Sequence, residues 1–208
     1  MEKRAETENY HKFDPQKIVD LANGIFGFSM TLLIVNISIP LLNKSKLHKL
    51  DFELYNMIPS VLTFSLSFFL LANFWMIYLY QMKNIKNVRS SFIYINIFLL
   101  LTVVFVPLTT NLVNEYPDLF LPNIIFNVNL FILGLFFLFQ WYYIVKNSLH
   151  IEPISEHYIK QRYARDMSLI VCSLIGICIC FVSPSWSSGV YVLLIIYSVF
   201  IRKKAENI

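Results

Sequence analysis

Long stretches without a charged side chain restrict this sequence to a membrane fold. Residues 54–82, 92–114, 119–145 and 167–201 contain no Asp, Glu, Lys, Arg or His. A helix needs about 20 apolar residues to cross the roughly 30 Å hydrocarbon core of a bilayer. Over the whole chain 57% of residues are hydrophobic and 14% are charged, whereas about a quarter are charged in soluble domains. We therefore predict an all-α membrane protein.

Six apolar segments are predicted to cross the bilayer as helices. They are residues 18–42, 54–82, 92–113, 119–145, 167–182 and 188–201. The last two are short, and the Pro- and Gly-containing segment between them predicts a tight turn, so they should form a hairpin. The predicted organisation is a polar N-terminus (1–16), a six-helix transmembrane domain (17–202) and a short tail (203–208). No internal repeat is evident, so a second copy of this domain must come from another chain.

Basic residues are distributed unevenly between the predicted loops, and this distribution predicts the topology. Lysines and arginines gather in the N-terminus, in the second loop, in the fourth loop (146–165) and in the tail, whereas the third loop carries only acidic charges. The positive-inside rule then places both termini in the cytoplasm. The first loop is an exception in which three lysines are partly offset by two acidic residues: Lys44, Lys46, Lys49, Asp51 and Glu53. The N-terminus lacks the apolar core of a secretory signal, so we expect a multi-pass protein that retains its first span.

The predicted spans offer no arrangement of residues for catalysis or metal binding. All four histidines fall in predicted loops or tails, and Cys172, Cys178 and Cys180 share one apolar segment, which favours packing over metal binding. There is no P-loop, no Gly-rich dinucleotide turn and no TVGYG-type filter. Proton-coupled transporters and intramembrane enzymes usually need an ionisable group at depth. We predict that the protein is not an enzyme, needs no cofactor or metal, and does not bind nucleic acid.

Residues 17–36, at the start of the first span, combine an apolar stripe with small and polar residues. On an α-helix one face carries Leu21, Gly24, Phe28, Thr31, Leu32 and Val35. Asn23 and Met30 point the opposite way. A helix with these two faces can serve two surfaces, one toward a symmetry axis and one toward its own bundle.

The other polar groups inside the spans are uncharged asparagine, serine, threonine and glutamine side chains. The simplest interpretation is hydrogen bonding between helices, worth around 0.6 kcal/mol for each contact. The functional interpretation is that some of them line a pore whose narrowest part is apolar and closes by dewetting. The composition of the spans leaves both interpretations open.

Three motifs follow one another in the first half of the chain. Lys17, LANGIF (21–26) and TLLIVNI (31–37) lie in the first span, SF…NFWMIY (67–78) in the second, and IN…LLL…VPLT (95–109) in the third. Together they resemble the transmembrane protein 175 family, the potassium channels of endolysosomes and bacteria. The resemblance extends over residues 17–116, and the remainder agrees in having three more spans.

The resemblance implies six helices per subunit, a homotetramer, and a central pore lined by the first helix of each subunit without a pore loop. By position in the family motif, Phe28, Leu32 and Val35 would form the apolar rings of a hydrophobic gate. All three lie on the stripe that helical spacing defines independently. Thr31 matches the threonine beside the constriction and would make the selectivity contact, with Asn36 near the outer mouth. The implied partners are potassium ions, the lipid bilayer and further copies of the chain.

The sequence departs from the family motif at its polar positions. Lys17 stands where the family has arginine, and Asn23 stands where it has aspartate. Lysine cannot reproduce the bidentate guanidinium–carboxylate pair. We expect a neutral inter-helix network of Asn23, Asn73 and Tyr78 to replace that pair, with Lys17 and Trp75 beside it.

These observations predict a potassium-preferring cation channel in a prokaryotic cytoplasmic membrane. One alternative is a facilitative transporter of a small neutral substrate, which would need an enclosed polar pocket within one subunit. Another is a non-conducting membrane scaffold of the same fold, which the altered polar motif leaves open.

Overall fold

The computed structural model describes residues 13–35, 37, 50–83, 85–86, 88–150 and 155–196. The elements are α2 (Pro15–Val35), α3 (Leu50–Asn56), α4 (Ile58–Met82), α5 (Ser90–Glu115), α6 (Phe120–Lys146), α7 (Glu156–Cys180) and the 3-10 helix η3 (Pro184–Gly189). Helical structure continues after η3, so that Pro184–Ile196 forms one short apolar helical segment. Within the described ranges, β-structure is confined to isolated bridges between loops.

Five helical stretches are long and apolar enough to cross a membrane. They are Pro15–Val35, Leu50–Met82 (α3 and α4 together), Ser90–Glu115, Phe120–Lys146 and Glu156–Cys180. The predicted all-α membrane fold is therefore confirmed. The sixth predicted span, 188–201, is described only as far as Ile196, where it forms the end of the short apolar segment.

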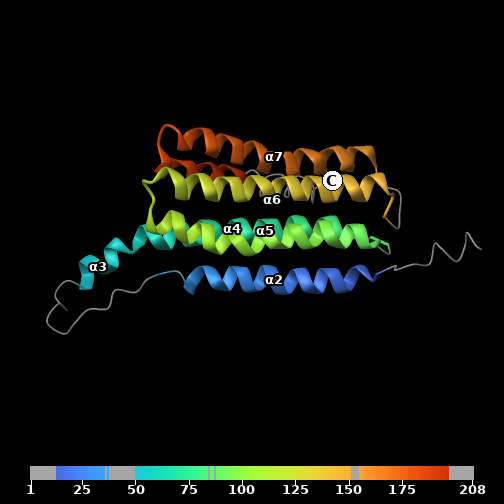
Figure 1. Cartoon of the computed structure of the whole chain (residues 1–208), viewed down its shortest axis with the longest axis horizontal. Coiled ribbons are helices and arrows are strands. Elements are labelled where there is room, and N and C mark those ends of the chain that lie inside the picture. Colours follow the sequence, from blue (N-terminus) through green and yellow to red (C-terminus); the bar gives the residue numbers. More distant parts are fainter. Residues whose placement is uncertain are drawn as a thin grey trace, which may run out of the picture.

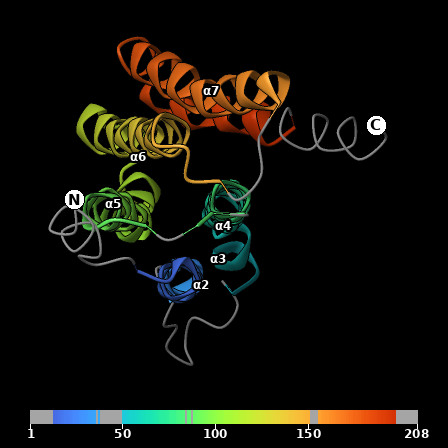
Figure 2. The ribbon, with the colours of Figure 1, turned by 90° about the vertical axis from the view of Figure 1, so that its right-hand side faces the viewer.

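The long helices pack side by side in successive layers (Figure 1). Helix α2 contacts α4 and α5, α5 contacts α6, and α6 contacts α7 and η3. Seen end-on, α4 and α5 lie between α2 on one side and α6 with α7 on the other (Figure 2). The core accordingly lies around α4, α5 and α6, where Phe74, Phe92, Leu130, Phe137 and Trp141 are almost completely buried.

Three connections meet at one end of the bundle. Isolated bridges join Phe13 to Val88 and Ile85 to His150, so the segment before α2, the α4–α5 connection and the α6–α7 connection are neighbours. This end, which we call the basic end, carries Lys83, Lys86, Arg89 and Lys146. The turn between α5 and α6 at the opposite end carries Glu115 and Asp118 instead.

The start of α7 differs from the sequence prediction. We expected residues 146–165 to form a loop and a span to begin at residue 167, but α7 begins at Glu156. The Ser155 hydroxyl caps the helix by accepting a hydrogen bond from the Tyr158 N–H at 3.3 Å. The prediction was wrong because it assigned charged residues to a loop, whereas the first turns of α7 bury two of them, Arg162 and Asp166.

Candidate functional site

Helix α2 has one face packed against the bundle and one face left uncovered. The packed face repeats every three or four residues and consists of Ile18, Ala22, Phe26, Ser29 and Leu33. On the uncovered side, 67% of Phe28 and 75% of Val35 is exposed. Both faces are apolar, so packing within one subunit covers only one side of the apolar surface of α2. The other half needs either lipid or another subunit.

The residues predicted to form the gate lie on this uncovered face. Phe28, Thr31 and Val35 are exposed, and Leu32 is half-buried. The Thr31 hydroxyl donates a hydrogen bond of 2.8 Å to the carbonyl of Phe28, so the lone pairs of its oxygen remain free to accept. Asn36, predicted near the outer mouth, lies outside the described residues.

A hydrogen bond joins α2 to α4 within the predicted inter-helix network. The indole N–H of Trp75 donates to Oδ1 of Asn23 at 2.8 Å. Tyr78 lies one turn further along α4, fully buried, with its ring centroid 6.0 Å from that of Phe26. The structure thus brings Asn23 and Trp75 together. Of the other residues predicted for the network, Asn73 is buried in α4 and Lys17 is exposed in the first turns of α2.

We expect Trp75→Phe to lower the free energy of unfolding by about 0.6 kcal/mol, because it removes a single hydrogen bond between membrane helices and keeps the aromatic ring. Denaturant unfolding of the purified protein in detergent measures this loss. Trp186→Phe is the matched control, because Trp186 is 75% exposed in η3 and should be neutral. The loss should disappear in an Asn23→Ala background, and an equal loss in both backgrounds would contradict the pairing.

Sequence reasoning missed a buried pair of opposite charges. Arg162 is 3% exposed and Asp166 is 1% exposed, and they lie one turn apart in α7. Nη2 of Arg162 donates to the Ile77 carbonyl of α4 at 3.0 Å. The guanidinium lies over the Trp141 ring, 5.4 Å from its centroid, an arrangement that favours a cation. Arg162 therefore fastens α7 to α4 and α6 near the basic end.

Gln81 holds the carboxylate of this pair. Its Nε2 donates both to Oδ2 of Asp166 at 2.9 Å and to the Phe137 carbonyl at 3.1 Å. His150, in the α6–α7 connection, places its ring 5.6 Å from Trp141. Burial lowers the pKa of the His150 imidazole, which favours its neutral form. Three helices and one connection therefore contribute to this cluster, which we call the α7 charge cluster (Arg162, Asp166, Gln81, Trp141 and His150).

A signal for the α7 charge cluster was present in the sequence. Arg162 and Asp166 continue, at a spacing of three and four residues, the buried face of α7 formed by Leu169, Ser173 and Gly176. Extending that face toward the N-terminus would have placed both charges inside the bundle. The absence of ionisable groups noted in the sequence therefore does not extend to the first turns of α7.

A second polar network joins α6 to the end of the described chain. Asn127 Oδ1 accepts from the Tyr191 hydroxyl at 2.7 Å, and Asn127 Nδ2 donates to the Asn123 carbonyl at 2.8 Å. The Ser187 hydroxyl donates to Asn123 Oδ1 at 3.2 Å. All of these side chains are buried. The network fixes η3 and the following helix against α6.

Residues 17–107, which contain nearly all of α2 and all of α4, match the family model described as the endosomal/lysosomal potassium channel TMEM175. The fold is similar to the crystal structure of a lysosomal potassium-selective channel TMEM175 homolog from Chamaesiphon minutus, with a TM-score of 0.78 and 22% sequence identity. That match covers 89% of this chain and 96% of the other. No curated protein matches significantly. The predicted family resemblance is confirmed, and the structural match shows a shared fold.

Proposed function

We propose, from the premise that residues 17–107 carry the TMEM175 pattern, that this chain forms a homotetrameric, potassium-preferring channel. The observation that carries the proposal is the uncovered apolar stripe of α2, where Phe28 and Val35 are mostly exposed although the opposite face is packed. Four copies arranged around an axis would cover this stripe. Gly24 supports close approach of a second helix, because a Cβ built there meets nothing within 4 Å.

In this arrangement the gate is a short apolar passage along α2. Phe28, Leu32 and Val35 from four subunits would form successive rings, and a narrow apolar passage excludes water and therefore ions. Thr31 lies between the first two rings and offers its hydroxyl oxygen as an acceptor, because the hydroxyl proton is already donated to the Phe28 carbonyl. An oxygen at that position would replace part of the hydration shell of a cation.

The topology of the proposed channel follows from its charges. The basic end carries Lys83, Lys86, Arg89 and Lys146, so the positive-inside rule places this end in the cytoplasm. Helix α2 begins at this end, which directs its last residue, Val35, toward the outer mouth. The proposed location is the cytoplasmic membrane, with both termini inside.

Neither alternative function gains support from the geometry. A facilitative transporter needs an enclosed polar pocket within one subunit. The grooves of about 680, 540 and 290 Å³ in the described part of the chain are lined mainly by aliphatic and aromatic side chains. A non-conducting scaffold of the same fold would be recognised by its failure to pass ions.

Potassium flux into liposomes containing the purified protein tests the proposal directly. Sodium and N-methylglucamine serve as comparison ions, and the oligomeric mass is determined in the same preparation. We expect a tetramer with potassium-favoured flux. A monomer would contradict the axial pore, and a folded tetramer without flux would favour the scaffold.

We expect Phe28→Ala to raise potassium flux severalfold, because it removes the bulkiest ring from the apolar passage. The same liposome flux assay measures the change. Ile34→Ala is the matched control, because Ile34 is 58% exposed on the same helix but lies off the stripe. Unchanged flux in Phe28→Ala, in a conducting wild-type background, would show that Phe28 is not the constriction.

A further inference from the structure

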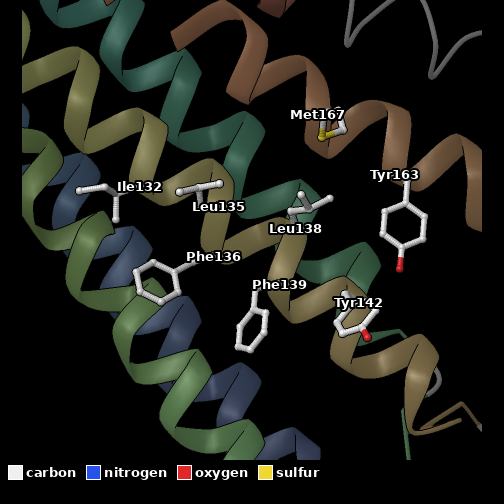
Figure 3. A pocket seen from close by; sticks show the side chains of 8 residues that line it. All are labelled: Ile132, Leu135, Phe136, Leu138, Phe139, Tyr142, Tyr163 and Met167. Carbon is white, nitrogen blue, oxygen red and sulfur yellow. The ribbon is translucent and has the colours of Figure 1, made fainter. Parts of the chain in front are cut away.

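A groove of about 680 Å³ runs between α6 and α7 on the outside of the bundle. Ile132, Leu135 and Phe139 of α6 and Met167 of α7 line it with aliphatic and aromatic surface (Figure 3). Tyr142 and Tyr163 lie together at one end of the groove, and they carry its hydroxyl groups (Figure 3). The groove is therefore apolar along its length and amphipathic at one end.

The length of the groove corresponds to one leaflet of a bilayer. From Ile132 to Tyr142 the groove follows α6 for ten residues, or about 15 Å at 1.5 Å per residue. Half of a hydrocarbon core of roughly 30 Å is the same length. The tyrosine end points toward the basic end, because Tyr142 precedes Lys146, the last residue of α6, by one turn. Tyrosines are enriched at this level of a membrane protein, where the hydrocarbon meets the headgroups.

A cation stands at the mouth of the groove. The Lys146 ammonium lies 5.4 Å from the centre of the Tyr142 ring and is exposed. Among the described residues the ion pair found is that of Lys160 with Glu156, at 3.8 Å. The charge of Lys146 is therefore available to an anion that approaches along the groove.

We propose that the α6–α7 groove binds an anionic phospholipid of the leaflet at the basic end. One acyl chain would lie along Ile132, Leu135 and Phe139, and the phosphate headgroup would meet Lys146. The tyrosine hydroxyls are placed at the level of the ester groups, which accept hydrogen bonds.

The position of the groove in the bundle favours lipid over a second subunit. Helices α6 and α7 lie on the side of the bundle opposite α2 (Figures 1 and 2). With α2 at the tetramer axis, the groove would face outward into the bilayer. This step rests on the proposed function, so lipid binding and subunit number have to be measured separately from flux.

Native mass spectrometry of the full chain in detergent, with added phosphatidylglycerol or phosphatidylcholine, tests the proposal. We expect Lys146→Gln to weaken phosphatidylglycerol binding about fivefold, since one lysine near an anionic surface contributes roughly that factor, and to leave phosphatidylcholine binding unchanged. Lys160→Gln is the matched control and should change neither. Leu135→Trp, which fills the groove, should weaken binding of both lipids.

Two outcomes would overturn the lipid site. If Lys146→Gln and Leu135→Trp both bind phosphatidylglycerol as tightly as the wild type does, the lipid binds elsewhere. A lower subunit number in Leu135→Trp would show that the groove is a contact between copies. Either result can be obtained whether or not the protein conducts potassium, so it is distinguishable from failure of the channel proposal.

Discussion

Replacing Arg162 with alanine is expected to lower the free energy of unfolding by about 3–5 kcal/mol, the usual cost of leaving one partner of a buried charge pair behind. Asp166, which is 1% exposed and accepts a hydrogen bond from Gln81, would lose the Coulombic attraction of the nearby Arg162. The Ile77 carbonyl would lose its contact with Nη2 of Arg162, and the Trp141 ring would lose its cation. Denaturant unfolding of the purified protein in detergent measures the change.

The control for this prediction lies on the same helix. Lys160 is paired with Glu156 at 3.8 Å, but its side chain is 80% exposed, so Lys160→Ala should cost less than about 1 kcal/mol. The double variant Arg162→Met with Asp166→Leu removes both charges together and should be more stable than Arg162→Ala. If Arg162→Ala lowers the free energy of unfolding by no more than Lys160→Ala does, burial of Arg162 and Asp166 does not make their interaction important for stability.

The class of fold could be predicted from the sequence because a bilayer permits few structures. Charge-free segments of this length must satisfy their backbone groups internally, and helices do so. The uncovered stripe of α2 was also predictable, because a spacing of three and four residues fixes which side chains share a face. Phe28 and Val35 lie on that face in the structure.

Which residues pair across helices could not be predicted in the same way. We expected Asn23, Asn73 and Tyr78 to form the network with Trp75 beside it, and in the structure Asn23 accepts a hydrogen bond from Trp75, three residues before Tyr78 on α4. The rotation of α4 about its axis decides which side chain faces Asn23, and here it places Trp75 at Asn23 and Tyr78 against Phe26. The same holds for the α7 charge cluster: helical spacing places Arg162 and Asp166 on the buried face of α7, but nothing in the local sequence identifies Gln81 of α4, 85 residues away, as the donor to Asp166.

Gly176→Ala is expected to lower the free energy of unfolding by about 3 kcal/mol, because overpacking typically costs 1–3 kcal/mol and a buried hydrogen bond would be strained as well. A Cβ at position 176 would collide with Oδ1 of Asn127 and lie 2.9 Å from its Cγ. Asn127 cannot move aside easily, since it accepts from Tyr191 at 2.7 Å and donates to the Asn123 carbonyl at 2.8 Å.

A double-mutant cycle separates this collision from an effect on the helix itself. Alanine is a better helix former than glycine by about 1 kcal/mol, so the substitution itself should not destabilise α7. Removing the Asn127 side chain should therefore remove the loss in the free energy of unfolding. In an Asn127→Ala background, Gly176→Ala should therefore be close to neutral in the same unfolding measurement. Gly189→Ala, where an added Cβ meets nothing within 4 Å, should be tolerated in the wild-type background. An equal cost of Gly176→Ala with and without Asn127 would mean that α7 and α6 do not meet through this pair of residues.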